Sequence, residues 1–513
     1  MLSAAAPSRR EDRPGPPEPE GSALPAWVRR SAYGLLVVQL VLMLLVSAYG
    51  YRHYAETYDF AIYTQAWTSI AHGHLDPYST ILGTTFWHNN SEFVMWPLAA
   101  LYWIHPHPDV LLWVQDLSVV ATEAVTFDWM VRILDRSAVP PGWRRVLGLG
   151  VAVVLVLDPW AWNVIAVDFH THALATLLVV LAGRDMWSGR TRRVWIWAVG
   201  AILCVAPAAL YVIGLGAATF FTCRATRRTS VLLMGAGAAW FLLVTQLGAD
   251  GGGGGNLGRW YGYLVSGTHR HVGLGSVLVG AAEHPMALSQ MIGQRWPIVF
   301  AFVAVMGLIG VASPWGLFPS AVVFLPSIFI LDPVFLTPGA SFQSWPALPF
   351  VLIGTVTVVA GWSDQGQRRR WLAVGAGVVW GAAFVAITAG ALPRVPSKWL
   401  AVSDPAAGEL ARLERAIPPD AEVLAVNGVM GRFAARSFVY QIGGASQRST
   451  FPVREPTLVF VISSTQGVGD PVFTTDPVLR LQERLGASLV VAGYGIYGLE
   501  WTPPPGTRSV SVP

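Results

Sequence analysis

SAYGLLVVQLVLMLLVSAYG, residues 31–50, is an uninterrupted apolar run that follows the basic pair Arg29 and Arg30. A helix of about 20 apolar residues is long enough to cross the hydrocarbon core of a bilayer. No small-residue cleavage site follows the run, so we interpret it as a retained signal anchor. The stretch before it is polar and rich in Pro and Glu, and we expect residues 1–30 to form a disordered cytoplasmic N-terminus.

The composition of the whole chain is that of a membrane protein. Of its 513 residues, 53% are hydrophobic and 12% are charged, which is about half the charged share of a soluble domain. The two cysteines, Cys204 and Cys223, form no spaced framework, so the sequence predicts neither a disulfide scaffold nor a thiolate metal site. We expect contact with membrane lipids and no nucleic-acid partner.

Arginine clusters divide the chain between the two sides of a membrane. Basic residues concentrate in cytoplasmic loops, and the clusters lie at residues 9–30, 136–145, 184–193, 224–228 and 368–370. With a cytoplasmic N-terminus, they predict a plasma-membrane protein with about eleven spans and an extracytoplasmic C-terminus. The predicted spans are 31–50, 109–134, 146–165, 172–186, 194–206, 208–222, 229–248, 297–312, 317–331, 346–362 and 371–391.

Two apolar stretches are harder to assign. Phe93–Ile104 is too short to cross, so we expect an interfacial or half-inserted helix. The block 194–222 is interrupted at Pro207, and it predicts either a hairpin of two short helices or one long helix.

All eleven histidines lie in or directly beside the predicted outer loops. This distribution favours a shared polar site on the outer face, although histidine is in any case commoner in loops than in lipid. The loops are 51–108, 166–171, 249–296 and 332–345.

Beyond residue 396 the pattern changes from long apolar runs to short alternating elements. Helix-like runs at 409–417 and 476–485 alternate with strand-like runs, which predicts an α/β domain. The strand-like runs are AEVLAVNG (421–428), SFVYQI (437–442), TLVFVIS (457–463) and SLVVAGYG (488–495). We therefore expect an α-helical polytopic membrane domain, 31–395, followed by a small extracytoplasmic α/β domain, 396–513.

Asp59 stands where the chain re-enters water after the first span, directly before the amphipathic run FAIYTQAW (60–67). Such a run is expected to lie in the plane of the membrane interface. A carboxylate at this boundary is well placed to take a proton from a hydroxyl as a general base. The alternative is a helix N-cap, a position that aspartate favours.

Two polar motifs of the outer loops are candidates for binding. They are FWHNNSEF (86–93), with His88 and Glu92, and VDFHTHAL (167–174), with Asp168, His170 and His172. The second motif offers oxygen and nitrogen ligands for a divalent metal cation. A polar turn whose histidines bond to backbone carbonyls is the alternative.

Asp116 and Glu123 lie seven residues apart on one face of the predicted span 109–134. Charges inside a bilayer are costly and usually face a cavity or a partner. A proton path and a structural hydrogen-bond network between helices both remain open.

Several of these motifs resemble a bacterial membrane family, domain of unknown function 2079. They are YDFAIYTQAW (58–67), HGHLDPYSTILG (72–83), the His88 segment, VDFHTHAL, IPPDAEVLAVNG (417–428) and RSFVYQIGG (436–444). That family is in turn similar to the membrane glycosyltransferases of the GT-C fold, which use polyprenyl-phosphate sugars. Members of the GT-C class carry an acidic residue just after the first span, and Asp59 is the matching position.

The resemblance implies inverting transfer of a sugar from a polyprenyl-phosphate donor to an envelope glycan or lipid acceptor. Asp59 would take the proton from the acceptor hydroxyl, while a cation steadies the departing phosphate. The resemblance implies that the donor phosphate or the substrate is bound by His88, Glu92, Arg259, Arg270 and Arg295. A divalent metal would be held by Asp168, His170 and His172, with His88 as a further ligand.

One motif of the family is missing. Its members often carry a Lys-Glu-Asp tripeptide at the outer tip of a helical hairpin, where this chain reads CVAPAALY (204–211). Either an arginine replaces the missing charge or catalysis has been lost. The alternatives are therefore a transporter or flippase of lipid-linked solutes, using Asp116 and Glu123, and a catalytically inactive envelope scaffold.

Overall fold

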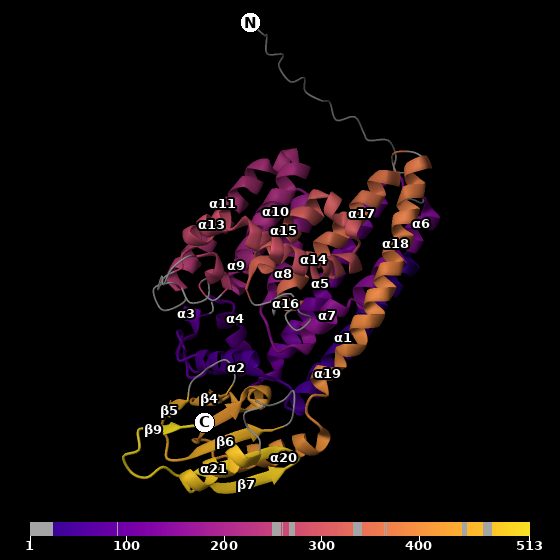
Figure 1. Cartoon of the computed structure of the whole chain (residues 1–513). Coiled ribbons are helices and arrows are strands. Elements are labelled where there is room, and N and C mark those ends of the chain that lie inside the picture. Colours follow the sequence, from indigo (N-terminus) through magenta and orange to yellow (C-terminus); the bar gives the residue numbers. More distant parts are fainter. Residues whose placement is uncertain are drawn as a thin grey trace.

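A bundle of helices and a smaller α/β domain at one end of it make up the protein (Figure 1). The computed structural model describes residues 24–89, 91–248, 258, 260–265, 272–331, 341–363, 365, 367–443, 449–464 and 475–512. The predicted fold class, a polytopic helical membrane protein with a small C-terminal α/β domain, is confirmed.

Each of the predicted spans falls on helical structure. The helices are α1 (Ala26–Arg52), α5 (Asp109–Asp135), α6 (Pro141–Val156), α7 (Pro159–Ala166), α8 (His172–Trp187), α9 (Thr191–Cys204), α10 (Ala208–Thr222), α11 (Arg227–Gly248), α14 (Pro285–Val305), α15 (Pro314–Phe329), α17 (Leu348–Ser363) and α18 (Gln367–Ala391). Among the described residues, six helical stretches have the length and apolar composition needed to cross a bilayer, and shorter apolar helices such as α10 and α15 pack between them. The apolar block around Pro207 forms two helices, because Val205 has extended backbone (φ −161°) and ends α9.

The arginine-rich and histidine-rich residues lie at opposite ends of the bundle. At one end Arg29 pairs with Asp135 at 2.7 Å. At the other end, where α1 meets the α/β domain, His53 Nε2 lies 2.9 Å from Asp404 Oδ1. The separation of charge along the helices is therefore present in the fold, and the assignment of the arginine end to the cytoplasm stays a prediction.

The α/β domain is built on a five-stranded sheet. Its strand order is β4 (Val439–Ile442), β3 (Glu422–Val426), β6 (Leu458–Ser463), β8 (Ile496–Trp501) and β7 (Ser488–Gly493). Strand β3 is parallel to both of its neighbours, whereas β8 is antiparallel to β6 and β7. All residues of β3 and β6 are buried, and α20 (Asp404–Ala416) packs against β7 and β8.

Strand β8 was missed in the sequence, where β7 was expected to be the last strand. Strands β7 and β8 form a hairpin whose two turn residues, Tyr494 (φ 50°) and Gly495 (φ 79°), both have left-handed backbone. Such turns usually contain Asn-Gly or Asp-Gly, whereas this one contains Tyr-Gly. Because tyrosine rarely adopts left-handed backbone, the hairpin was not recognisable from the sequence. The domain also contains α21 (Thr475–Leu485) and a small sheet of β5 (Thr450–Pro452) and β9 (Ser509–Ser511).

The first outer segment lies between the bundle and the α/β domain (Figure 1). Its principal helix, α2 (Tyr58–Ala71), has ten buried residues. All of them except Thr64 and Gln65 belong to one hydrophobic cluster with the sheet of the α/β domain. Protein therefore covers the apolar side of this run, and its position in the membrane interface stays a prediction. The segment continues through β1 (Tyr78–Ser79), β2 (Thr84–Thr85), α3 (Phe86–Asn89), α4 (Met95–Ala99) and η1 (Ala100–Trp103).

Backbone contacts fix the α/β domain on this segment. The Gly431 N–H donates to the carbonyl of Glu56 at 3.1 Å. A Cβ at position 431 would lie 2.6 Å from that same carbonyl oxygen, so only glycine allows this approach. The Thr80 hydroxyl donates to the Val439 carbonyl at 2.6 Å and accepts the Val439 N–H at 3.0 Å, on the edge strand β4. The two parts therefore meet with well-defined geometry beside α2.

Candidate functional site

Asp59 is the second residue of α2, and its carboxylate does not cap the helix. The N-cap position is Thr57, and no side chain forms a capping hydrogen bond there. The alternative explanation of Asp59 as an N-cap is therefore wrong, although a carboxylate still gains from the positive end of the helix dipole. The Asp59 side chain is 47% exposed, so its carboxylate is open to a substrate.

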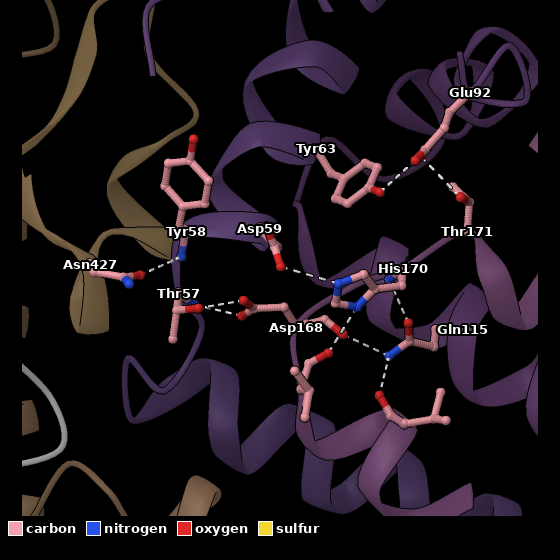
Figure 2. Close-up of polar contacts among 12 residues, drawn as sticks. Thr57, Tyr58, Asp59, Tyr63, Glu92, Gln115, Asp168, His170, Thr171 and Asn427 are labelled. Carbon is pink, nitrogen blue, oxygen red and sulfur yellow. Dashed lines mark hydrogen bonds and ion pairs between the residues drawn. The ribbon is translucent and has the colours of Figure 1, made fainter. Parts of the chain in front are cut away.

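The imidazole of His170 holds one oxygen of this carboxylate (Figure 2). His170 Nε2 lies 3.3 Å from Asp59 Oδ2, and Nδ1 lies 3.1 Å from the carbonyl oxygen of Val167. Both ring nitrogens face oxygen acceptors, so whichever nitrogen carries a proton donates it to one of them. The ring is 4% exposed and stacks on Phe342, with centroids 3.6 Å apart. It is thus a buried positioning group for an exposed carboxylate.

Hydrogen bonds to α5 and α2 define the turn that carries His170. The Gln115 side chain accepts the His170 N–H at 2.6 Å and donates to the Asp168 carbonyl at 2.8 Å. Asp168 has left-handed backbone (φ 44°), and its carboxylate accepts both the N–H and the hydroxyl of Thr57. Burial, together with the charge of Asp59, raises the pKa of Asp168. This carboxylate anchors Thr57, the residue directly before α2, from a distant loop.

The side chains of the predicted metal site contact other groups of the protein. Both oxygens of Asp168 are occupied by Thr57, and both nitrogens of His170 face other acceptors. Among the described residues, the ligand atoms of Asp168, His170 and His172 are not part of a group close enough to share an ion. The polar-turn alternative holds for His170, whose ring faces the carbonyl oxygen of Val167.

A second carboxyl group, Glu92, lies close to the Asp59 pair. Its two oxygens accept hydrogen bonds from the hydroxyls of Tyr63, at 2.9 Å, and Thr171, at 3.0 Å (Figure 2). Burial raises the pKa of Glu92 to about 7, although these two hydrogen bonds act in the opposite direction. The site therefore contains a buried carboxyl that titrates near neutral pH beside an exposed carboxylate, a pairing suited to acid and base roles.

Two further residues of the site were not identified from the sequence. Glu56 is buried, and its pKa is raised well above the usual value by burial and then by Asp168, with which it shares a hydrogen bond. Lys398, on α19 (Pro396–Trp399), is an exposed residue, but its ammonium group is partly buried. Burial lowers the pKa of this group, and the charges of Asp168 and Asp59 act in the opposite direction. Lys398 is the only lysine of the chain, and that singularity was the one available signal.

The other predicted binding residues lie elsewhere or have other roles. His88 is on α3, which packs against α11. The Arg295 guanidinium is buried and donates to the carbonyls of Ile328, Ile330 and Leu331 at the end of α15, so we correct its role from phosphate binding to structural support. Arg259 and Arg270 lie outside the described residues.

The acidic pair of α5 faces α1. Asp116 accepts from the Ser47 hydroxyl at 3.1 Å, and Glu123 accepts from the Gln39 amide at 3.2 Å. Both carboxyl groups are buried between the helices. These contacts favour the structural hydrogen-bond network over a proton path.

A model of the family described as "Predicted membrane protein (DUF2079)" matches residues 51–482. No curated protein is similar enough to count as a match. Among solved structures, the chain is similar to ArnT from Cupriavidus metallidurans bound to undecaprenyl phosphate, with 13% identity, coverage of 91% of this chain and 98% of that chain, and a TM-score of 0.47. For ArnT from the same organism in the apo state, the values are 13%, 92%, 98% and 0.44.

Proposed function

This chain belongs to the DUF2079 family of predicted membrane proteins, and from that premise we propose that it is a membrane glycosyltransferase of the GT-C type. It transfers a sugar, with inversion, from a polyprenyl-phosphate donor to an envelope acceptor at the histidine-rich end of the bundle. The proposal goes beyond the family match, because the family description names no activity. It rests on the chemistry of the site around Asp59.

The observation that carries the proposal is the pairing of an exposed carboxylate with a buried imidazole. His170 holds Asp59 Oδ2, which leaves Oδ1 free to accept a proton from a hydroxyl. A base oriented by a rigid partner is suited to general-base catalysis. The contact of His170 with Phe342 and Val167 keeps its ring in place during the reaction.

In the proposed reaction, the acceptor hydroxyl oxygen attacks the anomeric carbon from the face opposite the phosphate. The bond between this carbon and the phosphate oxygen breaks, and its electron pair leaves with the polyprenyl phosphate. Asp59 takes the hydroxyl proton. The Lys398 ammonium, a partly buried cation beside the two aspartates, is the group we assign to the departing phosphate. It supplies the charge that is missing at CVAPAALY.

Sugar transfer by the purified full-length protein tests the proposal. Labelled polyprenyl-phosphate sugars are incubated with envelope glycan and lipid fractions, and labelled acceptor is measured. Asp59→Asn is expected to reduce transfer by about 10²–10⁴-fold, the usual contribution of a general base. Asp76→Asn is the matched control, because Asp76 is an exposed aspartate of the same outer segment. Equal transfer by Asp59→Asn and wild type would remove Asp59 from the mechanism.

A further inference from the structure

The segment His105-Pro106-His107-Pro108-Asp109 brings three potential metal ligands together directly before α5. Asp109 Oδ1 lies 3.2 Å from His105 Nε2 and 2.7 Å from His107 Nδ1. All three ligand atoms lie within 4.8 Å of one another. Two imidazoles and one carboxylate form a donor set typical of zinc and related divalent ions.

The backbone and the neighbouring rings keep this group in one arrangement. Pro106 and Pro108 restrict the φ angles of the segment, and the His107 N–H donates to the His105 carbonyl at 2.8 Å. The His105 ring stacks on Trp113, with centroids 5.1 Å apart and planes at 16°. The His107 ring contacts the edge of Tyr51 at 5.0 Å. A chelating group that is already ordered loses little conformational entropy when an ion binds.

A purely structural role explains this cluster poorly. Asp109 is the first residue of α5, but the N-cap residue is Pro108 and no side chain forms a capping hydrogen bond. Instead, a single carboxylate oxygen faces both imidazoles. The side chains of His105 and His107 are 43% and 47% exposed, so a hydrated ion has access from solvent.

We propose that His105 Nε2, His107 Nδ1 and the Asp109 carboxylate bind a divalent transition-metal ion of the zinc class. Three protein ligands leave a fourth, water-filled position in tetrahedral geometry. The carboxylate offsets the repulsion between the ion and the positive N-terminal end of α5. The site is separate from the Asp59 site and does not depend on the proposed transferase activity. It braces the start of α5 against Tyr51 of α1.

Metal titration of the full chain, purified without a polyhistidine tag and stripped with a chelator, tests this proposal. We expect one Co²⁺ per chain, with the intense visible absorption of a four-coordinate ion, and displacement by Zn²⁺. Asp109→Asn and the double variant His105→Ala/His107→Ala are expected to abolish the absorption. His74→Ala, which removes an exposed histidine of the same outer segment, is expected to leave it unchanged.

Circular dichroism of the metal-free variants distinguishes lost ligands from lost fold. Loss of Co²⁺ absorption with an unchanged spectrum and unfolding temperature supports the site. Three results would overturn the proposal: no stoichiometric binding by the wild-type chain, full binding by Asp109→Asn and by the double histidine variant, or loss of binding in His172→Ala with retention in the double variant. The last result would return the metal to the turn at 168–172.

Discussion

His170 Nε2 lies 3.3 Å from Asp59 Oδ2, and this contact joins two outer segments that are 111 residues apart in the chain. The imidazole is almost fully buried, whereas the carboxylate is about half exposed. The contact places the buried imidazole of His170 against the exposed carboxylate that we propose as the general base. It also links the membrane bundle to the segment on which the α/β domain rests.

The energetic coupling of Asp59 and His170 can be measured with a double-mutant cycle. If His170 acts by orienting the carboxylate, His170→Gln will reduce sugar transfer in wild type but will have little further effect in Asp59→Asn. The expected interaction energy between the two positions is about 0.5–3 kcal/mol. Rates of transfer for the four proteins give this energy, and strictly additive losses would show that His170 does not act through Asp59.

Glu92 predicts a pH dependence of stability. Its pKa is raised to about 7 in the folded protein, from an ordinary value of 4.5. The folded state therefore binds the proton of Glu92 more tightly than the unfolded state does. The resulting contribution to the free energy of unfolding is fully present below about pH 4.5 and is lost as the pH rises through 7. Thermal unfolding in detergent between these values should show a steeper decline for wild type than for Glu92→Gln. Parallel curves for the two proteins would contradict the assigned shift.

Gly431→Ala should loosen the α/β domain. The added Cβ would lie 2.6 Å from both the Cβ and the carbonyl oxygen of Glu56, so the backbone must shift. Overpacking of this kind costs about 1–3 kcal/mol. Gly408→Ala is the control, since Gly408 lies in α20 with open space around it and alanine favours helix. The free energy of unfolding should fall in the first variant and stay equal or rise in the second.

Thr80→Val removes a hydroxyl that is hydrogen-bonded to the backbone of the edge strand β4. This hydroxyl accepts the Val439 N–H and the Gln65 amide, and it donates to the Val439 carbonyl. Unpaired buried polar groups cost about 1–3 kcal/mol, and a drop of this size in stability is expected. Thr245→Val is the comparison, because the Thr245 hydroxyl donates only to carbonyls of its own helix. Similar losses in both variants would contradict the special role of Thr80.

Asp116→Asn distinguishes the enzyme from a transporter. The asparagine oxygen can still accept the Ser47 hydroxyl, so the packing of α1 on α5 should be retained. We expect unchanged sugar transfer and normal folding. A transporter that uses the Asp116 carboxylate to bind its solute would instead lose substrate flux in proteoliposomes, whereas a scaffold would show neither activity.

Much of the fold was predictable because it depends on local patterns. Apolar runs such as residues 31–50 cannot be solvated and must form helices in a bilayer. Alternating short elements after residue 396 likewise indicated the α/β domain. The strand β8 was missed because its turn uses Tyr494, whose left-handed backbone is stabilised by the hairpin rather than by its own preference.

The candidate site was predictable in part. The position of Asp59 after the first span drew attention to it, and Glu92 and His170 were recognised as outer polar groups. The roles of His170 and Asp168 were assigned differently, because their hydrogen-bond partners Asp59 and Thr57 lie far from them along the chain. The roles of Glu56 and Lys398 also depend on contacts that no sequence spacing encodes.

By itself, the sequence indicated which segments form long apolar helices, which ends of these helices carry arginine and which carry histidine, and that an α/β domain follows. These properties follow from the transfer of each short segment between water and lipid, so they need no knowledge of the neighbours. Only the tertiary structure decided that Asp59 is open while Asp168 is occupied, and that His105, His107 and Asp109 converge around one point. Hydrogen bonding and metal ligation act over about 2–3 Å. Distances of that size depend on the backbone conformation of each turn, as at residues 105–109, and on packing between elements that are remote in the chain, as for Asp59 and Asp168.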